Sequence, residues 1–261
     1  MSEMSGLAVD LAGVTKTFDN GVMALGPLDL AVGHGEFVSL VGPSGCGKST
    51  ALRLIAGLAT PTSGRIAVSH RPGAERPGHA IGFVFQEPTL MPWTSVRENV
   101  RLPLKLANVP SAESDARIAE ALARVGLADF AGAYPRELSG GMKMRVSLAR
   151  ALVTDPDILL MDEPFAALDE ITRFRLNNDL LTLWRKLNKT VVFVTHSVFE
   201  SVYLSQRVVV MTQRPGRLDA DIVIATSEPR TEDFRTSAEY GEYCRKVSAA
   251  LSPAYEGLTA L

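Results

Sequence analysis

The sequence has few cysteines and no long apolar run, and each absence excludes a class of protein. Its 261 residues contain 2 cysteines, Cys46 and Cys244. They are far apart in the sequence and match no disulfide framework or cysteine metal motif, which suits a reducing compartment. No window approaches the roughly 20 apolar residues of a membrane-spanning helix, since VVFVTHSVFESVYL is interrupted by His196 and Glu200. We therefore expect the chain to be soluble by itself.

An excess of charge of one sign is also lacking. The chain has 27 Lys+Arg against 29 Asp+Glu, a formal net charge of -2. It therefore has no global positive charge of the kind that nucleic-acid-binding proteins carry. Its start, MSEMSGLAVD, has an acid where a secretion signal needs positive charge, and no apolar stretch follows. We expect neither a secretion signal nor a nucleic-acid partner.

Apolar segments alternate with helical patterns along the chain. LAVDLAGV and LDLAV alternate apolar and polar residues, which predicts an antiparallel sheet near the N-terminus. EFVSLVG, AIGFVF, ILLMDEP and TVVFVTH are continuous apolar runs, which are typical of strands buried on both faces of a parallel sheet. Helical spacing follows the first of these runs at residues 48–56 and the third at about 169–187. The pattern predicts an α/β fold with a mostly parallel sheet.

The middle of the chain has a different character, because helical patterns replace the apolar runs. We expect Ser111 to cap a helix with an apolar face formed by Ile118, Leu122 and Val125. We interpret this region as a helical subdomain inserted into the α/β core. The expected division is 1–94 and 153–225 for the core, 95–152 for the helical subdomain and 226–261 for a C-terminal helical tail.

One segment between an apolar run and a helical pattern matches G-x-x-x-x-G-K-[ST], which is typical of a phosphate-binding loop. Its glycines let backbone N–H groups turn towards phosphates, and the following helix N-terminus adds partial positive charge. We expect Lys48 to contact the β- and γ-phosphates of ATP and the Ser49 hydroxyl to ligate Mg²⁺. We interpret Cys46 as a small residue that fits the loop rather than as a redox switch. The segment consists of Gly42, Pro43, Ser44, Gly45, Cys46, Gly47, Lys48, Ser49 and Thr50.

Polar residues stand at the ends of three of the buried strands. ILLMDEP ends in two adjacent carboxylates, which a strand does not carry for stability because burying unpaired charge is unfavourable. We expect Asp162 to hold the magnesium shell and Glu163 to polarise a water for attack on the γ-phosphate. His196 is a candidate sensor of the γ-phosphate, and the Gln86 amide can reach both a metal ion and a water.

A second helix start with anion-binding features occurs in LSGGMKMRVSLARAL. Ser139 is placed to cap this helix, and Gly140 and Gly141 leave its first N–H groups open to a phosphate. A capped helix start without a ligand is the alternative. Two such helix starts in one chain suggest that two copies share nucleotides across an interface.

The order of these motifs resembles the ATP-binding subunits of ATP-binding cassette (ABC) transporters over nearly the whole chain. It runs GPSGCGKST, Gln86, LSGGM, ILLMDEP, ALD, His196. The resemblance implies one ABC ATPase domain over residues 1–261 and a head-to-tail homodimer. In that dimer two ATP molecules lie between the phosphate loop of one copy and Ser139–Met142 of the other.

The resemblance also implies roles for single residues. Glu163 corresponds to the general base, His196 to a switch residue and Asp169, in ALD, to an interface residue that couples the two sites. Phe18, in VTKTFDNG, matches the aromatic residue that stacks on adenine. Met142 stands where Gln is commoner, a mild departure at a contact made mainly by backbone.

Two further segments, FQEPTLMPWTSVRENV and EPRTEDFRTSAEY, resemble the nitrate, sulfonate, taurine and bicarbonate importer group. This implies a subunit on the cytoplasmic face of the inner membrane that energises import of a small anion or related nutrient. Its partners would be integral-membrane permease subunits and an extracytoplasmic solute-binding protein. Trp93 is either a permease contact or a buried anchor of the helical subdomain. An exporter, a lipid-transport ATPase and a soluble non-transport ABC ATPase are the alternatives.

Overall fold

The computed structural model describes residues 6–69, 81–226 and 230–256. The start of the chain, MSEMS, and Glu228 and Pro229 of the closing stretch lie outside these ranges. The chain divides into two units: the first comprises Met1–Ala74 and Thr190–Leu261, and the second comprises Glu75–Lys189. Among the described residues, no helix is both long and apolar enough to cross a membrane.

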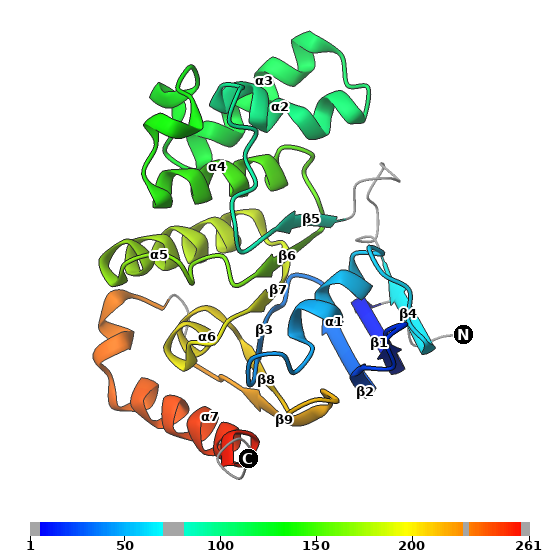
Figure 1. Ribbon diagram of the computed structural model, residues 1–261. Coiled ribbons are helices and arrows are strands. Elements are labelled where there is room, and N and C mark those ends of the chain that lie inside the picture. Colours follow the sequence, from blue (N-terminus) through cyan, green and yellow to red (C-terminus); the bar gives the residue numbers. More distant parts are fainter. Residues whose placement is uncertain (1–5, 70–80, 227–229, 257–261) are drawn as a thin grey trace. The chain divides into compact units, whose positions relative to one another are not determined.

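An antiparallel sheet in the order β2-β1-β4 opens the first unit (Figure 1). From Pro27 to Val32, alternate residues of β2 are buried, because successive side chains of a strand point to opposite faces of its sheet. In the turn after β1, the backbone N–H of Phe18 donates to the carbonyl of Val22 at 2.9 Å. The expected N-terminal antiparallel sheet is confirmed. Its strands are β1 (Leu7–Thr17), β2 (Met23–Gly33) and β4 (Ser63–Val68).

The first unit also contains a mostly parallel sheet in the order β7-β3-β8-β9. The central strand β3 runs parallel to β7 and β8, whereas β9 is antiparallel to β8. Every residue of β3 and β7 is buried, which explains why their sequences are continuous apolar runs. The strands are β3 (Phe37–Val41), β7 (Thr190–Val194), β8 (Arg207–Met211) and β9 (Leu218–Val223).

Helices α1 (Lys48–Ile55), α6 (Val198–Leu204) and α7 (Ala238–Glu256) complete the first unit, with a short 3-10 turn at Glu232–Thr236. Helix α7 packs on α6 and β8. Before it, the buried Arg230 guanidinium donates to the carbonyls of Val202, Tyr203 and Ser205 through Nη1. The segment that leads to α7 is therefore fastened to the end of α6.

The second unit contains two parallel strands, β5 and β6, and helices α2 to α5. Three of these helices start at a side-chain cap: Ser95 accepts from Glu98 N, Ser139 from Met142 N, and Asp169 from Thr172 N. The elements are β5 (Ile81–Val84), α2 (Val96–Leu106), α3 (Ser111–Arg124), α4 (Gly140–Leu152), β6 (Ile158–Asp162) and α5 (Glu170–Leu187), with 3-10 turns at Ala128–Phe130 and Pro135–Glu137.

Helix α3 starts one residue away from the expected cap. Pro110 is the N-cap and Ser111 is already the first helical residue. The reason lies in the backbone: the Pro110 carbonyl accepts the first helical bond from Ser114 N at 2.9 Å, and an extended proline suits the position before a helix. The expected apolar face is present, since Ile118 and Leu122 are buried.

Candidate nucleotide-binding site

The segment Gly42–Gly47 forms a loop between the end of β3 and the start of α1. Gly45 and Gly47 have φ angles of +73° and +109°, which side-chain-bearing residues rarely adopt. A Cβ on Gly47 would lie 2.6 Å from Leu25 Cδ2 and 2.8 Å from the Ala24 carbonyl oxygen. The loop can therefore curve as it does only with glycine at this position. It leads directly into the N-terminus of α1, where the partial positive charge of a helix favours an anion.

The Lys48 side chain turns back into this loop. It is only 4% exposed, and its ammonium donates to the carbonyls of Gly42 at 2.8 Å and Pro43 at 3.0 Å. The positive charge thus sits inside the curve of the loop, held by groups that phosphate oxygens can replace. A bound phosphate would meet a cation that is already in place.

Cys46 faces the protein interior beneath the loop. Its side chain is buried, and burial raises the pKa of the thiol, although the nearby Lys48 ammonium partly offsets the rise. Reactive cysteines need a lowered pKa and access to solvent. The geometry therefore favours the interpretation of Cys46 as a small packing residue.

A turn after β8, which sequence reasoning missed, supports the loop from outside. Arg214 Nε donates to the Gly45 carbonyl at 3.0 Å. Two residues further on, a Cβ on Gly216 would lie only 1.9 Å from the Cys46 carbonyl oxygen. The Pro-Gly pair signals a turn, but no feature of the sequence indicates that this turn packs against a loop so far back in the chain.

His196 and Phe18 also belong to the first unit. The Thr195 backbone N–H donates to the Leu40 carbonyl at 3.3 Å. His196 therefore follows β7 at the same edge of the sheet from which the phosphate loop leaves β3. Its turn is braced by Thr195, which donates to Glu200 Oε2 at 2.5 Å. Phe18 is 43% exposed, and the Lys16 ammonium lies over its ring, 5.5 Å from the centroid.

Gln86, Asp162 and Glu163 lie together in the second unit. Val84 and Met161 are partners in the parallel pair of β5 and β6, so both strands end at one edge and bring these polar residues to it. Asp162 is buried, and Glu163 has a φ of +46°. Left-handed backbone is unfavourable for a residue with a side chain and is concentrated at functional sites.

The structure gives the two glycines at the start of α4 different environments. Ser139 Oγ caps the helix by accepting from Met142 N at 3.3 Å, and Gly140 beside it is exposed. Gly141 is buried, and a Cβ there would lie 2.7 Å from Thr172 Cγ2 of α5. Close packing of two helices thus explains Gly141, whereas Gly140 leaves the helix start open to an anion.

Asp169 caps the N-terminus of α5 in the second unit, in addition to its expected role at the interface. Its Oδ1 accepts from the Thr172 backbone N–H at 2.9 Å at the start of α5. This hydrogen bond stabilises the charged form and lowers the pKa of Asp169.

Two residues that sequence reasoning missed hold the segment after Gln86. Arg150 of α4 donates to the Pro88 carbonyl at 2.7 Å and to the Thr89 carbonyl at 2.8 Å, and burial lowers the pKa of its guanidinium. Asn99 of α2 is fully buried, and its Oδ1 accepts from the Met91 backbone N–H at 2.7 Å. The segment is therefore anchored to the helix that Ser139 caps and to α2.

Trp93 lies within this anchored segment and is 75% exposed. Of the two alternatives for Trp93, the buried anchor of the helical subdomain is therefore excluded. Asn99 and Arg150 anchor the segment instead, with hydrogen bonds to its backbone. Tryptophan is enriched among the residues that dominate protein–protein contacts, and this one is accessible to a partner.

The strand, glycine loop and helix, with a buried lysine inside the loop, define a P-loop nucleotide-binding protein of the α/β class. A family model described as ABC transporter matches residues 25–166. The chain belongs to this family and is an ATP-binding, ATP-hydrolysing enzyme. The fold class and family expected from the sequence are confirmed.

Curated relatives match over most of their length. An uncharacterised ABC transporter ATP-binding protein of Methanocaldococcus jannaschii is 49% identical and covers 90% of this chain and 87% of its own. A taurine import ATP-binding protein of Rhizobium johnstonii is 44% identical, with 94% and 96% covered. A nitrate import ATP-binding protein of Synechocystis sp. is 44% identical, with 88% of each covered.

Solved structures agree with the fold. An ATP-binding cassette solved as a dimer in a post-hydrolysis state, bound to ADP and phosphate, superposes with a TM-score of 0.72 at 35% identity. It covers 84% of this chain and 100% of its own. A cassette of an ABC transporter complex from Clostridium perfringens gives a TM-score of 0.76 at 26% identity and covers 98% of this chain.

Proposed function

We propose that this protein is the ATPase subunit that energises a type I ABC importer for a small anion or related nutrient. The observation that carries the proposal is its similarity to proteins named for taurine and nitrate import. In the taurine relative the match covers 94% of this chain, and so extends well past residue 166, where the family model ends. Nitrate, sulfonates, taurine and bicarbonate are the substrates that we would test first.

For nucleotide binding, we assign adenine stacking to Phe18 and phosphate binding to Gly42–Thr50. The loop fits this assignment, because it leads into the N-terminus of α1 and the buried Lys48 ammonium inside its curve can neutralise negative charge. Ser49, Gln86 and Asp162 offer the oxygen ligands that Mg²⁺ prefers, and the ion would neutralise charge on the phosphates.

For hydrolysis, we assign the general base to Glu163. Its carboxylate would accept a proton from the water that attacks the γ-phosphate. We assign His196 as the residue that senses the γ-phosphate, because it stands at the same sheet edge as the phosphate loop.

Two copies of the chain are proposed to share their nucleotides head to tail. The exposed, Ser139-capped start of α4 is the surface that would meet the phosphates held by the other copy, with Ser139, Gly140, Gly141 and Met142 contributing. Asp169 would lie at the same interface. The dimeric state of the solved cassette supports this arrangement.

We further propose that the segment after Gln86, with Trp93 exposed on it, contacts an integral-membrane permease. The chain would then lie peripherally at the cytoplasmic face of the inner membrane and work with an extracytoplasmic solute-binding protein. In this scheme residues 95–152 act as the helical subdomain that moves with the permease, and no nucleic acid is involved.

The catalytic part of the proposal is tested with Glu163→Gln. We expect this variant to lose ATP turnover and to accumulate as an ATP-bound dimer. Light scattering coupled to gel filtration would measure the mass of that dimer. Glu239→Gln on α7 is the matched control, and its turnover should equal that of the natural sequence. Hydrolysis at the original rate by Glu163→Gln would show that another residue is the base.

The transport part is tested with the assembled complex in vesicles. Taurine, nitrate, an alkanesulfonate and bicarbonate would each be offered with the solute-binding protein, and ATP would be placed on the side of the ATPase subunits. Import predicts ATP-dependent movement of one of these solutes towards the ATPase side. Movement in the opposite direction would identify an exporter, and turnover that no permease affects would favour a soluble ATPase.

A further inference from the structure

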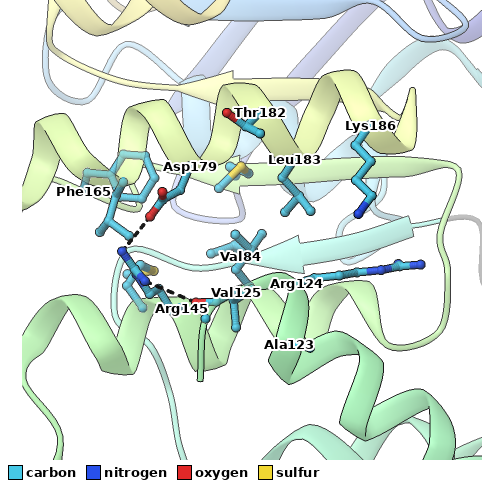
Figure 2. A pocket seen from close by; sticks show the side chains of 15 residues that line it. Val84, Ala123, Arg124, Val125, Arg145, Phe165, Asp179, Thr182, Leu183 and Lys186 are labelled. Atoms are coloured by element: carbon cyan, nitrogen blue, oxygen red, sulfur yellow. Dashed lines mark hydrogen bonds and ion pairs between the residues drawn. The ribbon is translucent and has the colours of Figure 1, made fainter. Parts of the chain in front are cut away.

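The second unit contains a cavity of about 410 Å³ that none of the expected nucleotide-site residues lines. Figure 2 shows its walls, which come from the end of α3, from α4 and α5, and from strands β5 and β6. Pockets that bind small molecules have volumes of about 300 to 1,000 Å³. The cavity is therefore large enough for a small organic ligand.

The inner surface of the cavity is apolar. Val84 and Met161 come from the ends of β5 and β6, and both side chains are buried within the protein. Met144, Leu148 and Phe165 also line it. Such a surface favours a ligand with an aromatic or aliphatic body, because the transfer of apolar groups out of water lowers the free energy.

Cationic side chains dominate the charged part of the lining. Arg124, Arg145 and Lys186 stand against one carboxylate, Asp179. In Figure 2, Lys186 from α5 and Arg124 from α3 extend on the same side of the cavity. The lining therefore carries a net positive charge, which favours an anionic group and disfavours a cation.

Arg145 of α4 contacts two other elements that form the walls of the cavity. Its Nη2 pairs with Asp179 Oδ2 at 2.6 Å, and its Nη1 donates to the Val125 carbonyl at 3.3 Å. It thereby links α4 to α5 and to the end of α3. Arg124 pairs with Glu120 on its own helix at 2.6 Å. Lys186 is exposed at the cavity, and among the described residues no ion pair is recorded for it. It is therefore well placed to meet an anionic group of a ligand.

We propose that this cavity binds a small amphipathic anion, with one carboxylate or sulfonate group on an aromatic or aliphatic body. The body would lie against Met144, Leu148 and Met161, and the anionic group would face Lys186 and Arg124. The site is separate from the nucleotide-binding residues and does not depend on which solute is transported. Both α4 and Phe165, which follows the Glu163 turn, would contact the ligand.

The test uses 1-anilinonaphthalene-8-sulfonate as the probe and the full chain labelled with ¹³C at the methionine methyl groups. Of the 8 methionines, Met144 and Met161 line the cavity. Their signals would be assigned with Met144→Leu and Met161→Leu. We expect saturable shifts at these two methyl groups. Octanoate in place of the probe separates aliphatic carboxylates from aromatic sulfonates, and phenyltrimethylammonium should produce no shift.

Two variants test the source of the affinity. Lys186→Glu reverses one charge at the cavity and should weaken binding roughly fivefold to tenfold. Lys105→Glu on α2 makes the same charge change at an exposed residue outside the lining, and should leave the affinity unchanged. Thr182→Trp, at an exposed position on the lining, should fill the cavity and abolish binding while ATP turnover shows that the protein still folds. Shifts confined to other methionines would overturn the proposal. So would Lys186→Glu and Thr182→Trp variants that bind the probe with the affinity of the natural sequence.

Discussion

At the scale of single residues, the left-handed backbone of Glu163 separates stability from activity. A residue with a side chain is less stable than glycine at such a φ angle by about 1 kcal/mol. We therefore expect Glu163→Gly to have a higher free energy of unfolding than Glu163→Ala by about 1 kcal/mol, although both lose hydrolysis. Urea denaturation of the two variants measures the difference.

The matched control is Glu120 in the middle of α3, where the helix reverses the preference. Ala should be more stable than Gly there by about 1 kcal/mol. At Glu120 the glycine variant should be the less stable of the two. If Glu163→Gly were likewise less stable than Glu163→Ala, the left-handed conformation would not persist in solution.

The two cysteines should be unreactive in the folded protein. Both are buried, and burial raises the pKa of each thiol, so little thiolate is present at pH 8. We expect iodoacetamide to label the native chain roughly 100-fold more slowly than the chain in denaturant. Mass spectrometry of timed samples measures both rates. Fast labelling of Cys46 in the native protein would restore the redox-switch interpretation.

The same raised pKa values fix the sign of a pH effect. Between the ordinary thiol pKa of about 8.5 and the higher folded pKa, the unfolded chain loses protons that the folded chain keeps. The stabilisation that comes from keeping the thiols protonated is therefore fully present below that pH range. The free energy of unfolding falls as the pH rises through it.

At the scale of elements, the contact of α4 with α5 depends on Gly141. A methyl group there would meet Thr172 Cγ2 at 2.7 Å. We expect Gly141→Ala to lower the free energy of unfolding by about 1 to 2 kcal/mol. The same change should be milder by about 1 kcal/mol in a Thr172→Ser background, because serine lacks the methyl group. An equal loss in both backgrounds would mean that the two helices do not meet at these residues.

Elements were predictable from the sequence where the pattern is local. Buried strands such as β3 and β7 have continuous apolar sequences, and the glycine loop has a fixed spacing. Arg150, Asn99 and Arg214 were missed because each acts by a hydrogen bond to backbone that lies outside its own element, and such contacts leave no periodicity. The roles assigned to the site residues stay predictions.

At the scale of the whole molecule, Trp93 should matter only in the assembled transporter. Removing its exposed ring takes away contact area without disturbing Asn99 or Arg150. We expect Trp93→Ala to weaken binding to the permease by roughly tenfold or more, as loss of an interface tryptophan does, and to leave ATP turnover of the isolated chain unchanged. Co-purification at graded salt concentrations measures the first effect.

Phe130→Ala is the control for this experiment, because Phe130 is also an exposed aromatic residue of the second unit. It lies outside the segment after Gln86, so it should not affect binding to the permease. Equal retention of the permease by Trp93→Ala and the natural sequence would remove Trp93 from the proposed contact.

The division of the chain has a consequence for its synthesis. Strand β3 ends at Val41, whereas its partners begin at Thr190 and Arg207, 149 and 166 residues later. At 5 to 20 residues per second, a ribosome needs roughly 7 to 30 s to supply them. The second unit is contiguous in sequence, so all of it is synthesised before either strand that pairs with β3. A nascent chain that stops before Thr190 therefore carries the whole glycine loop but lacks both strands that flank β3.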